Sequence, residues 1–212
     1  MSRWLAPAFW GGGWTAAACF LIGDLQMVAG RDDSGARWIA YLGHVAAAVP
    51  LLAIAPLQFV TAIRLGRPAM HRWLGRVFLA TAMLSGLLAV FLGATMASEG
   101  TQMPLMLFGL LWACFAGVAW LAAWRGDYAT HRRFVWRVIA LASSFVVLHL
   151  MQMWETELFG FLESGELRYA TRGWLSLVLP LLAVEAWLGW APPIWGLFRR
   201  ADKREMGETT RG

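Results

Sequence analysis

The sequence predicts an all-α protein that crosses a membrane six times. Its 212 residues are 59% hydrophobic and include 14 tryptophans, which is too apolar for one soluble domain of this length. Six apolar stretches reach the roughly 20 residues that a helix needs to span a bilayer. Basic residues gather between alternate stretches, as in chains that pass back and forth through a membrane.

Each predicted helix ends at a polar or charged break. The six are expected at residues 9–29, 38–63, 73–96, 103–124, 134–154 and 174–198, and together they form one transmembrane domain. The first is interpreted as an uncleaved span, because its apolar run continues past the small residues before Cys19. Pro50 and Pro56 are expected to bend the second helix. An arginine pair ends the sixth, and residues 199–212 are a polar cytoplasmic tail.

The distribution of lysine and arginine predicts the orientation of the chain. All but four of the 18 lie at the N-terminus, in the 64–76 and 125–137 regions or in the tail. Because short cytoplasmic loops are rich in these residues, both termini are expected in the cytoplasm. The net charge of +5 therefore reflects topology, and the chain has no soluble basic face for nucleic acid. Tryptophans near the predicted ends, which are expected to anchor the helices at the interface, are Trp10, Trp38, Trp73, Trp124, Trp154 and Trp174.

Two short segments repeat the pattern Gly-x-x-Ala-x-His-Arg. They are "GRPAMHRWLGR" at residues 66–76 and "GDYATHRRFVWR" at residues 126–137. Each precedes a helix that runs outward, so the second and third helices look like a parallel counterpart of the fourth and fifth. His71 and His131 are therefore expected across a pseudo-two-fold axis at the cytoplasmic end.

These motifs resemble an uncharacterised family of bacterial predicted membrane proteins, domain of unknown function 2306. The resemblance covers roughly residues 15–190 and depends on "RLGRPAMHRWLGRV" and "HRRFVWRVIAL" with a later histidine. It implies a polytopic protein of a bacterial inner membrane and no particular reaction.

The four histidines sort into two depths. His149 follows His131 by 18 residues, which is five turns and roughly 27 Å along one helix face. His44 and His149 thus form an outer candidate pair, and His71 and His131 form an inner one. This arrangement is similar to membrane b-type cytochromes with two haems, in which facing imidazoles hold each haem iron. It predicts haem b and electron transfer across the membrane, with a quinone or a redox protein as partner, in an oxidoreductase subunit.

Other polar residues admit both redox and structural roles. Arg72 and Arg132 could bind haem propionates, or anchor the chain to anionic lipid. Asp24 and Glu185 are expected inside helices, where a carboxylate serves a proton or quinone path or bonds to a neighbouring helix. A non-redox protein that binds lipid or a partner protein is the alternative.

A copper site is a further alternative. Methionines near the outer helix ends could join His149 in a soft site suited to Cu(I), although methionine also fills gaps in apolar cores. They are Met27, Met96, Met103, Met106, Met151 and Met153. No hydrolase or phosphate-loop motif is present in the sequence.

Overall fold

The structure is a computed structural model that describes residues 22, 35–95 and 99–190. Within these residues it is helical and has no strand. Five helices are long and apolar enough to cross a membrane, the last together with a short π-helix, η1. They are α2 (Ala36–Phe59), α4 (Pro68–Thr95), α5 (Glu99–Trp124), α6 (Tyr128–Met153) and α8 (Gly165–Glu185) with η1 (Ala186–Trp190). Apart from residue 22, the predicted helix at 9–29 lies outside the described residues, as does the tail. The described residues confirm the all-α membrane class and five of the predicted spans.

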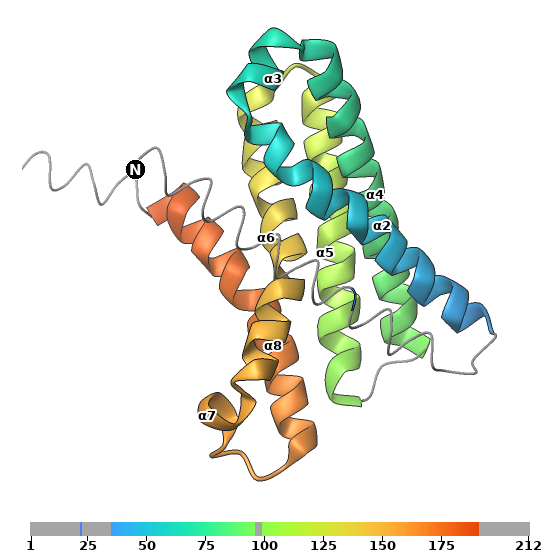
Figure 1. Cartoon of the computed structure of the whole chain (residues 1–212), viewed down its shortest axis with the longest axis vertical. Helices are drawn as coiled ribbons and strands as arrows, with labels where there is room; N and C mark the ends of the chain where they lie inside the picture. The colour runs from blue at the N-terminus through green and yellow to red at the C-terminus, as the bar shows by residue number, and fades with distance from the viewer. Residues whose placement is uncertain (1–21, 23–34, 96–98, 191–212) are drawn as a thin grey trace, which may run out of the picture.

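The spans form a bundle in which α4, α5 and α6 stand side by side (Figure 1). Helix α2 crosses this group obliquely and packs mainly on α4, whereas α8 packs on α6 and α5. Two short helices mark the ends of the bundle: α3 (Thr61–Gly66) lies at one end and α7 (Glu155–Phe159) at the other. The core is formed by apolar side chains of α2, α4, α5 and α6, with residues of α8 packed against it.

All five spanning helices begin earlier than the apolar pattern predicts, and α4, α6 and α8 do so by five residues or more. Helix α6 starts at Tyr128 because Asp127 caps it, accepting a hydrogen bond from the backbone N–H of Thr130 at 3.0 Å. Helix α8 starts at Gly165, capped by Ser164, and α4 starts with Pro68, whose fixed φ suits a first helical position. A prediction based on apolarity ends each helix at the first charged residue. A capped first turn at the membrane edge can include charged residues, so these helices begin before the apolar run.

The predicted second helix is divided in two. Helix α2 ends at Phe59, Val60 is extended, and α3 follows after this break. The two Gly-x-x-Ala-x-His-Arg segments also differ locally: Gly66 ends α3, whereas Gly126 forms a turn with φ of 78°. The repeat therefore places His71 and His131 in the first turns of α4 and α6, which run in the same direction (Figure 1).

The Asp127 cap should make stability depend on pH. Hydrogen bonds from the side chain and backbone of Thr130 hold the pKa of the Asp127 carboxyl below its ordinary value of 3.8. A lowered folded-state pKa stabilises the fold above 3.8, and this stabilisation is lost as the pH falls through the lowered value. Asp127→Ala should therefore lower the thermal unfolding midpoint near neutral pH, and the difference from the natural chain should shrink in acid. Glu163→Ala removes a loop carboxylate that caps no helix. Its unfolding midpoint should therefore show no pH-dependent convergence with that of the natural chain.

Glycines bring α4 and α5 into backbone contact. A Cβ added to Gly86 would lie 2.6 Å from the carbonyl oxygen of Gly109, and one added to Gly109 would lie 2.7 Å from the carbonyl oxygen of Gly86. Ala82 and Ala116 nearby are completely buried. Small residues allow such close approach between membrane helices, where van der Waals packing is a main source of association. The α4–α5 pair is the most closely packed contact of the bundle.

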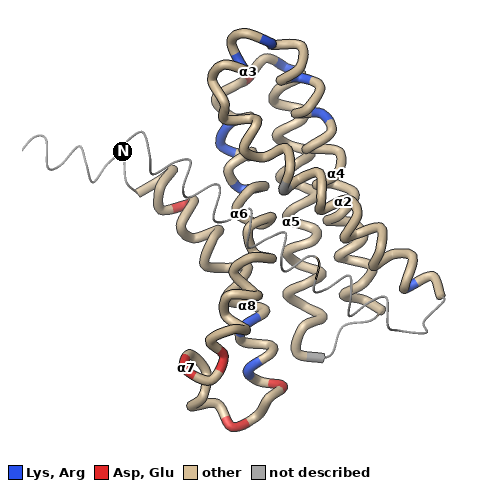
Figure 2. Tube along the Cα trace, in the orientation of Figure 1, with Lys and Arg blue, Asp and Glu red and all other residues tan. Residues whose placement is uncertain are grey.

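Most charged residues lie at the two ends of the bundle: arginines dominate one end, and glutamates outnumber Arg168 and Arg172 at the other (Figure 2). We call the end formed by α3, the starts of α4 and α6 and the α5–α6 turn the basic end. Its arginines are Arg64, Arg67, Arg72, Arg76, Arg125, Arg132, Arg133 and Arg137. We call the opposite end the acidic end; its glutamates, around α7 and the start of α8, are Glu155, Glu157, Glu163 and Glu166. Between the ends, large apolar side chains such as Leu87 and Leu110 are more than half exposed, as expected for a surface covered by lipid.

Candidate functional site

The basic end carries far more positive than negative charge. In the described part of the chain, Arg137 alone among its arginines forms an ion pair. Asp127 is the acidic residue of the α5–α6 turn, and its carboxylate is occupied in capping α6. The first turns of α4 and α6 add the positive ends of two helix dipoles. This end of the bundle therefore attracts anions.

His71 and His131 lie together at this end. They are close enough for their charges to interact, and Arg64 and Arg72 also act on the His71 ring. The His131 Nδ1 atom is 2.8 Å from the carbonyl oxygen of Ala119 on α5. Because a carbonyl oxygen only accepts, Nδ1 carries the proton and Nε2 of the neutral ring bears the lone pair.

Two buried side-chain nitrogens in this region have no partner among the described residues: Nδ1 of His71 and Nε2 of Gln58. The Gln58 side chain lies against Gly75, where an added Cβ would come within 3.3 Å of its Oε1 atom. Gly75 is one turn after His71 on α4, so Gln58 and His71 approach the same helix face. Buried polar atoms in proteins are nearly always bonded. The unpartnered pair therefore indicates a place for a polar ligand or for water.

The outer histidines are placed differently. His44 Nδ1 lies 2.9 Å from the carbonyl oxygen of Ser85 on α4, and the Ser85 hydroxyl donates to the carbonyl oxygen of His44 at 3.2 Å. His149 Nδ1 lies 2.9 Å from the carbonyl oxygen of Phe145 in its own helix. His44 is thus bonded to α4 and His149 to its own helix, and α2 and α6 separate toward the acidic end (Figure 1).

Glu185 is held by a neighbouring helix. Arg137 Nε donates to one carboxylate oxygen at 2.5 Å and a terminal nitrogen donates to the other at 2.8 Å. This bidentate pair joins α6 to the end of α8, where the backbone changes to the π-helix η1. Arg137 also lies over the ring of Phe134, 4.8 Å from its centroid. Asp24, the other predicted intramembrane carboxylate, lies outside the described residues.

The residues proposed for metal binding remain predictions. In the described ranges no group of three or more His, Cys, Asp or Glu side chains could hold a metal ion. Among the methionines, Met106 packs beside Gly93 and Met103 is 68% exposed. Met27 and Met96 lie outside the described residues, so a copper site at the outer helix ends stays untested. Cys114 is a free, exposed thiol.

Several polar residues of the bundle were missed by sequence reasoning. Ser85 and Gln58 are polar residues within apolar helices: Ser85 bonds to His44 of α2, and Gln58 lies against Gly75 of α4. Trp112 is buried and its indole N–H donates to the carbonyl oxygen of Val138 at 3.1 Å, so it is not an interfacial anchor. Only the rarity of Ser and Gln within long apolar runs could have marked such positions.

These features define the class: an integral membrane protein whose spans are apolar helices, with His71, His131 and most of the described arginines at one end of the bundle. The chain belongs to the family described as predicted membrane protein (DUF2306), which matches residues 41–188. The matched range begins in α2 and ends in η1, so it includes both histidine-arginine motifs. No curated protein and no solved structure matches the chain.

Proposed function

We propose that the protein binds an anionic, phosphate-bearing headgroup at its basic end. The observation that carries this proposal is the pair of buried, unpartnered nitrogens on Gln58 and His71 beside His131. Gln58 supplies amide N–H groups, and the exposed residues Arg64 and Arg72 lie near these nitrogens and form no ion pair with any described residue. Neutral and cationic donors around one position are what a phosphate oxygen requires.

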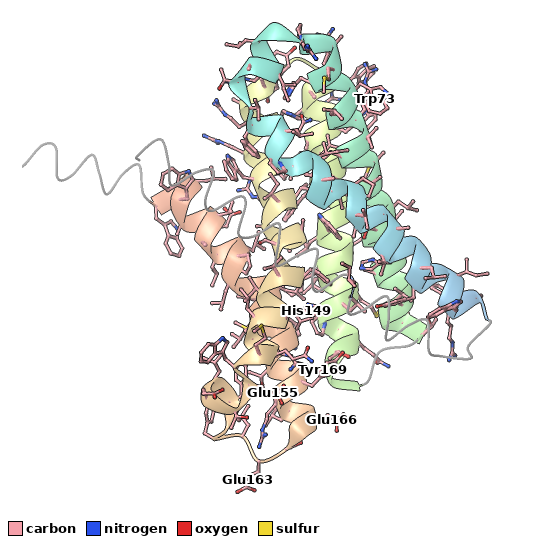
Figure 3. All side chains as sticks on the ribbon, in the orientation of Figure 1. Trp73, His149, Glu155, Glu163, Glu166 and Tyr169 are labelled. Atoms are coloured by element: carbon pink, nitrogen blue, oxygen red, sulfur yellow. The ribbon has the colours of Figure 1, made fainter. Side chains whose placement is uncertain are left out.

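Charge and position favour a headgroup taken from the membrane. The site lies where α3 joins the first turn of α4, and Trp73 is 62% exposed at the same end, as an interfacial tryptophan would be (Figure 3). Anionic lipids concentrate at the cytoplasmic leaflet, where basic segments are attracted to them. A lipid can bring its phosphate to this depth without leaving the bilayer.

Native mass spectrometry of the full chain in a neutral detergent tests this proposal. Phosphatidylglycerol should be retained more strongly than phosphatidylcholine, and Gln58→Leu or His71→Leu should weaken its binding roughly tenfold, the effect of one or two lost hydrogen bonds. Arg125→Gln is the matched control, because Arg125 is exposed at the same end and belongs to the α5–α6 turn. If Arg125→Gln weakens binding as much as the others, the attraction is diffuse and the proposed site does not exist. Inorganic phosphate added as competitor distinguishes a phosphate site from one that needs the whole lipid.

We also propose, as a second candidate, that the histidines hold b-type haem for electron transfer across the membrane. The supporting observation is the ring orientation: Nδ1 of His44 and of His131 meets a backbone carbonyl, which leaves Nε2 with the lone pair. Metal-bound histidines use this arrangement, in which an outer hydrogen bond fixes the tautomer. Haem, when bound, would supply a one-electron redox centre, and these side chains would hold and orient it.

A reduced-minus-oxidised visible spectrum of the protein expressed with added haem tests this second candidate. A b-type band that is lost in His71→Ala and His131→Ala assigns haem to the basic end. Loss in His44→Ala and His149→Ala assigns it to the outer pair. No band in the natural chain excludes b-type haem and leaves the headgroup proposal unaffected.

A further inference from the structure

The third unpartnered nitrogen lies at the acidic end of the bundle. Arg172, on α8, is only 6% exposed, and its buried Nε atom has no partner in the described part of the chain. One terminal nitrogen of the guanidinium forms an ion pair with Glu155 of α7. The guanidinium carbon lies 5.2 Å from the centre of the Tyr169 ring. Arg172 is therefore a buried cation whose donors are only partly used.

We propose that Arg172, beside helix α7, binds an amphiphile through a singly charged oxyanion, which is a carboxylate or a phosphodiester. A guanidinium presents Nε and a terminal nitrogen as a planar fork that matches two oxygens of one anion. Glu155 contacts the other side of the group through one terminal nitrogen. An oxyanion at the Nε side would satisfy the donor that the protein leaves open, which otherwise costs stability.

The local charges select a monoanion. Arg168 lies one turn before Arg172 on the same face of α8, and its Nε atom donates to the carbonyl oxygen of Leu162 at 2.6 Å. Two arginines and the Glu155 carboxylate leave one positive charge, which one negative charge neutralises. Glu163 and Glu166 lie at the same end of the bundle (Figure 3), and their charges disfavour a doubly charged phosphate more than a monoanion.

The apolar surroundings indicate that the ligand carries a hydrocarbon tail. Phe159 of α7 is buried, whereas Trp154 and Phe161 on either side of α7 are 58% and 78% exposed. Exposed aromatic side chains at a helix end lie where bilayer interfaces begin. A ligand can therefore place its charged group beside Arg172 and leave its chain among lipids. This site lies at the opposite end from the proposed headgroup site and does not depend on it.

Binding to the full chain in maltoside detergent tests the inference, with laurate and lysophosphatidylglycerol as anionic probes and dodecanol as the neutral comparator. Laurate should raise the thermal unfolding midpoint, and Arg172→Lys should weaken its binding by about tenfold or more, because lysine keeps the charge and loses the fork. Glu155→Gln, which frees the guanidinium from its internal anion, should tighten binding. Arg37→Gln, an exposed arginine at the start of α2, is the matched control and should leave binding unchanged.

The outcomes are distinct. Binding of laurate alone supports the site with a carboxylate ligand, and binding of both anionic probes supports a general monoanion site. Equal effects of dodecanol and laurate, or unchanged affinity in Arg172→Lys, would overturn the proposal. If Arg172→Lys fails to fold, the direction of the Glu155→Gln effect decides: weaker binding contradicts the inference, and tighter binding supports it.

Discussion

Gly86→Ala should destabilise the bundle by about 1–3 kcal/mol, the usual effect of forcing one extra carbon into a packed core. The new Cβ would lie 2.6 Å from the Gly109 carbonyl oxygen and 2.9 Å from the backbone nitrogen of Ala113. Both atoms belong to the backbone of α5, so the contact is relieved only when the two helices move apart. The free energy of unfolding in mixed detergent micelles measures the effect.

Gly117→Ala provides a matched comparison. Gly117 is also a helical glycine within the α4–α5 pair, but an added Cβ there would meet only Met83 Sδ at 4.0 Å. Alanine favours a helix over glycine by up to about 1 kcal/mol, so this variant should be neutral or more stable. Equal destabilisation by the two substitutions would show that the close approach of α4 and α5 does not limit the packing.

Breaking the Arg137–Glu185 pair should strongly destabilise the bundle. Arg137→Leu leaves the Glu185 carboxylate without its partner in an apolar region. Glu185→Leu likewise leaves the Arg137 guanidinium without its partner. Arg137 is nine residues into α6, roughly 13 Å from its start. Each variant should lose about 2–4 kcal/mol, somewhat below the value for a fully buried pair because the Glu185 side chain is 38% exposed.

The double variant Arg137→Leu with Glu185→Leu should recover most of that loss, because no isolated charge remains. The unfolding free energies of the natural chain, the two single variants and the double variant form a thermodynamic cycle. Its coupling energy measures the interaction between Arg137 and Glu185. Arg133→Leu, one turn earlier on α6 with no ion pair, is the control and should change stability little. Additive single effects in the cycle would mean that the two side chains are not coupled in the membrane.

The sequence predicts the spans well because lipid imposes a simple rule on length and apolarity. The same rule fails at Tyr128 and Gly165, where capped first turns carry charges and extend α6 and α8 beyond the apolar run. It also misses the break at Val60, which leaves no mark in a run of apolar residues. Membrane class was therefore predictable, whereas helix ends were not.

The candidate site was predictable only where a local motif repeats. The matched motifs place His71 and His131 at the starts of two parallel helices, and their proximity follows from that register. Gln58, which lies beside Gly75, and Ser85, which bonds to His44, belong to helices whose rotation about their axes is set by packing, and one sequence does not show that rotation. The pairing of Glu185 with Arg137 likewise joins residues 48 apart, which no local pattern connects.

The prolines of α2 make this helix easier to bend than α4 and α5. Pro50 and Pro56 lack an N–H, so the carbonyls one turn before each have no intrahelical donor. Helix α2 can therefore bend at two points without breaking another hydrogen bond, whereas α4 and α5 are fixed by contact between their backbones. Gln58 stands two residues beyond the second proline. Bending at Pro56 would thus change the position of this side chain relative to His71, whereas the α4–α5 backbone contact would resist a similar displacement of His71.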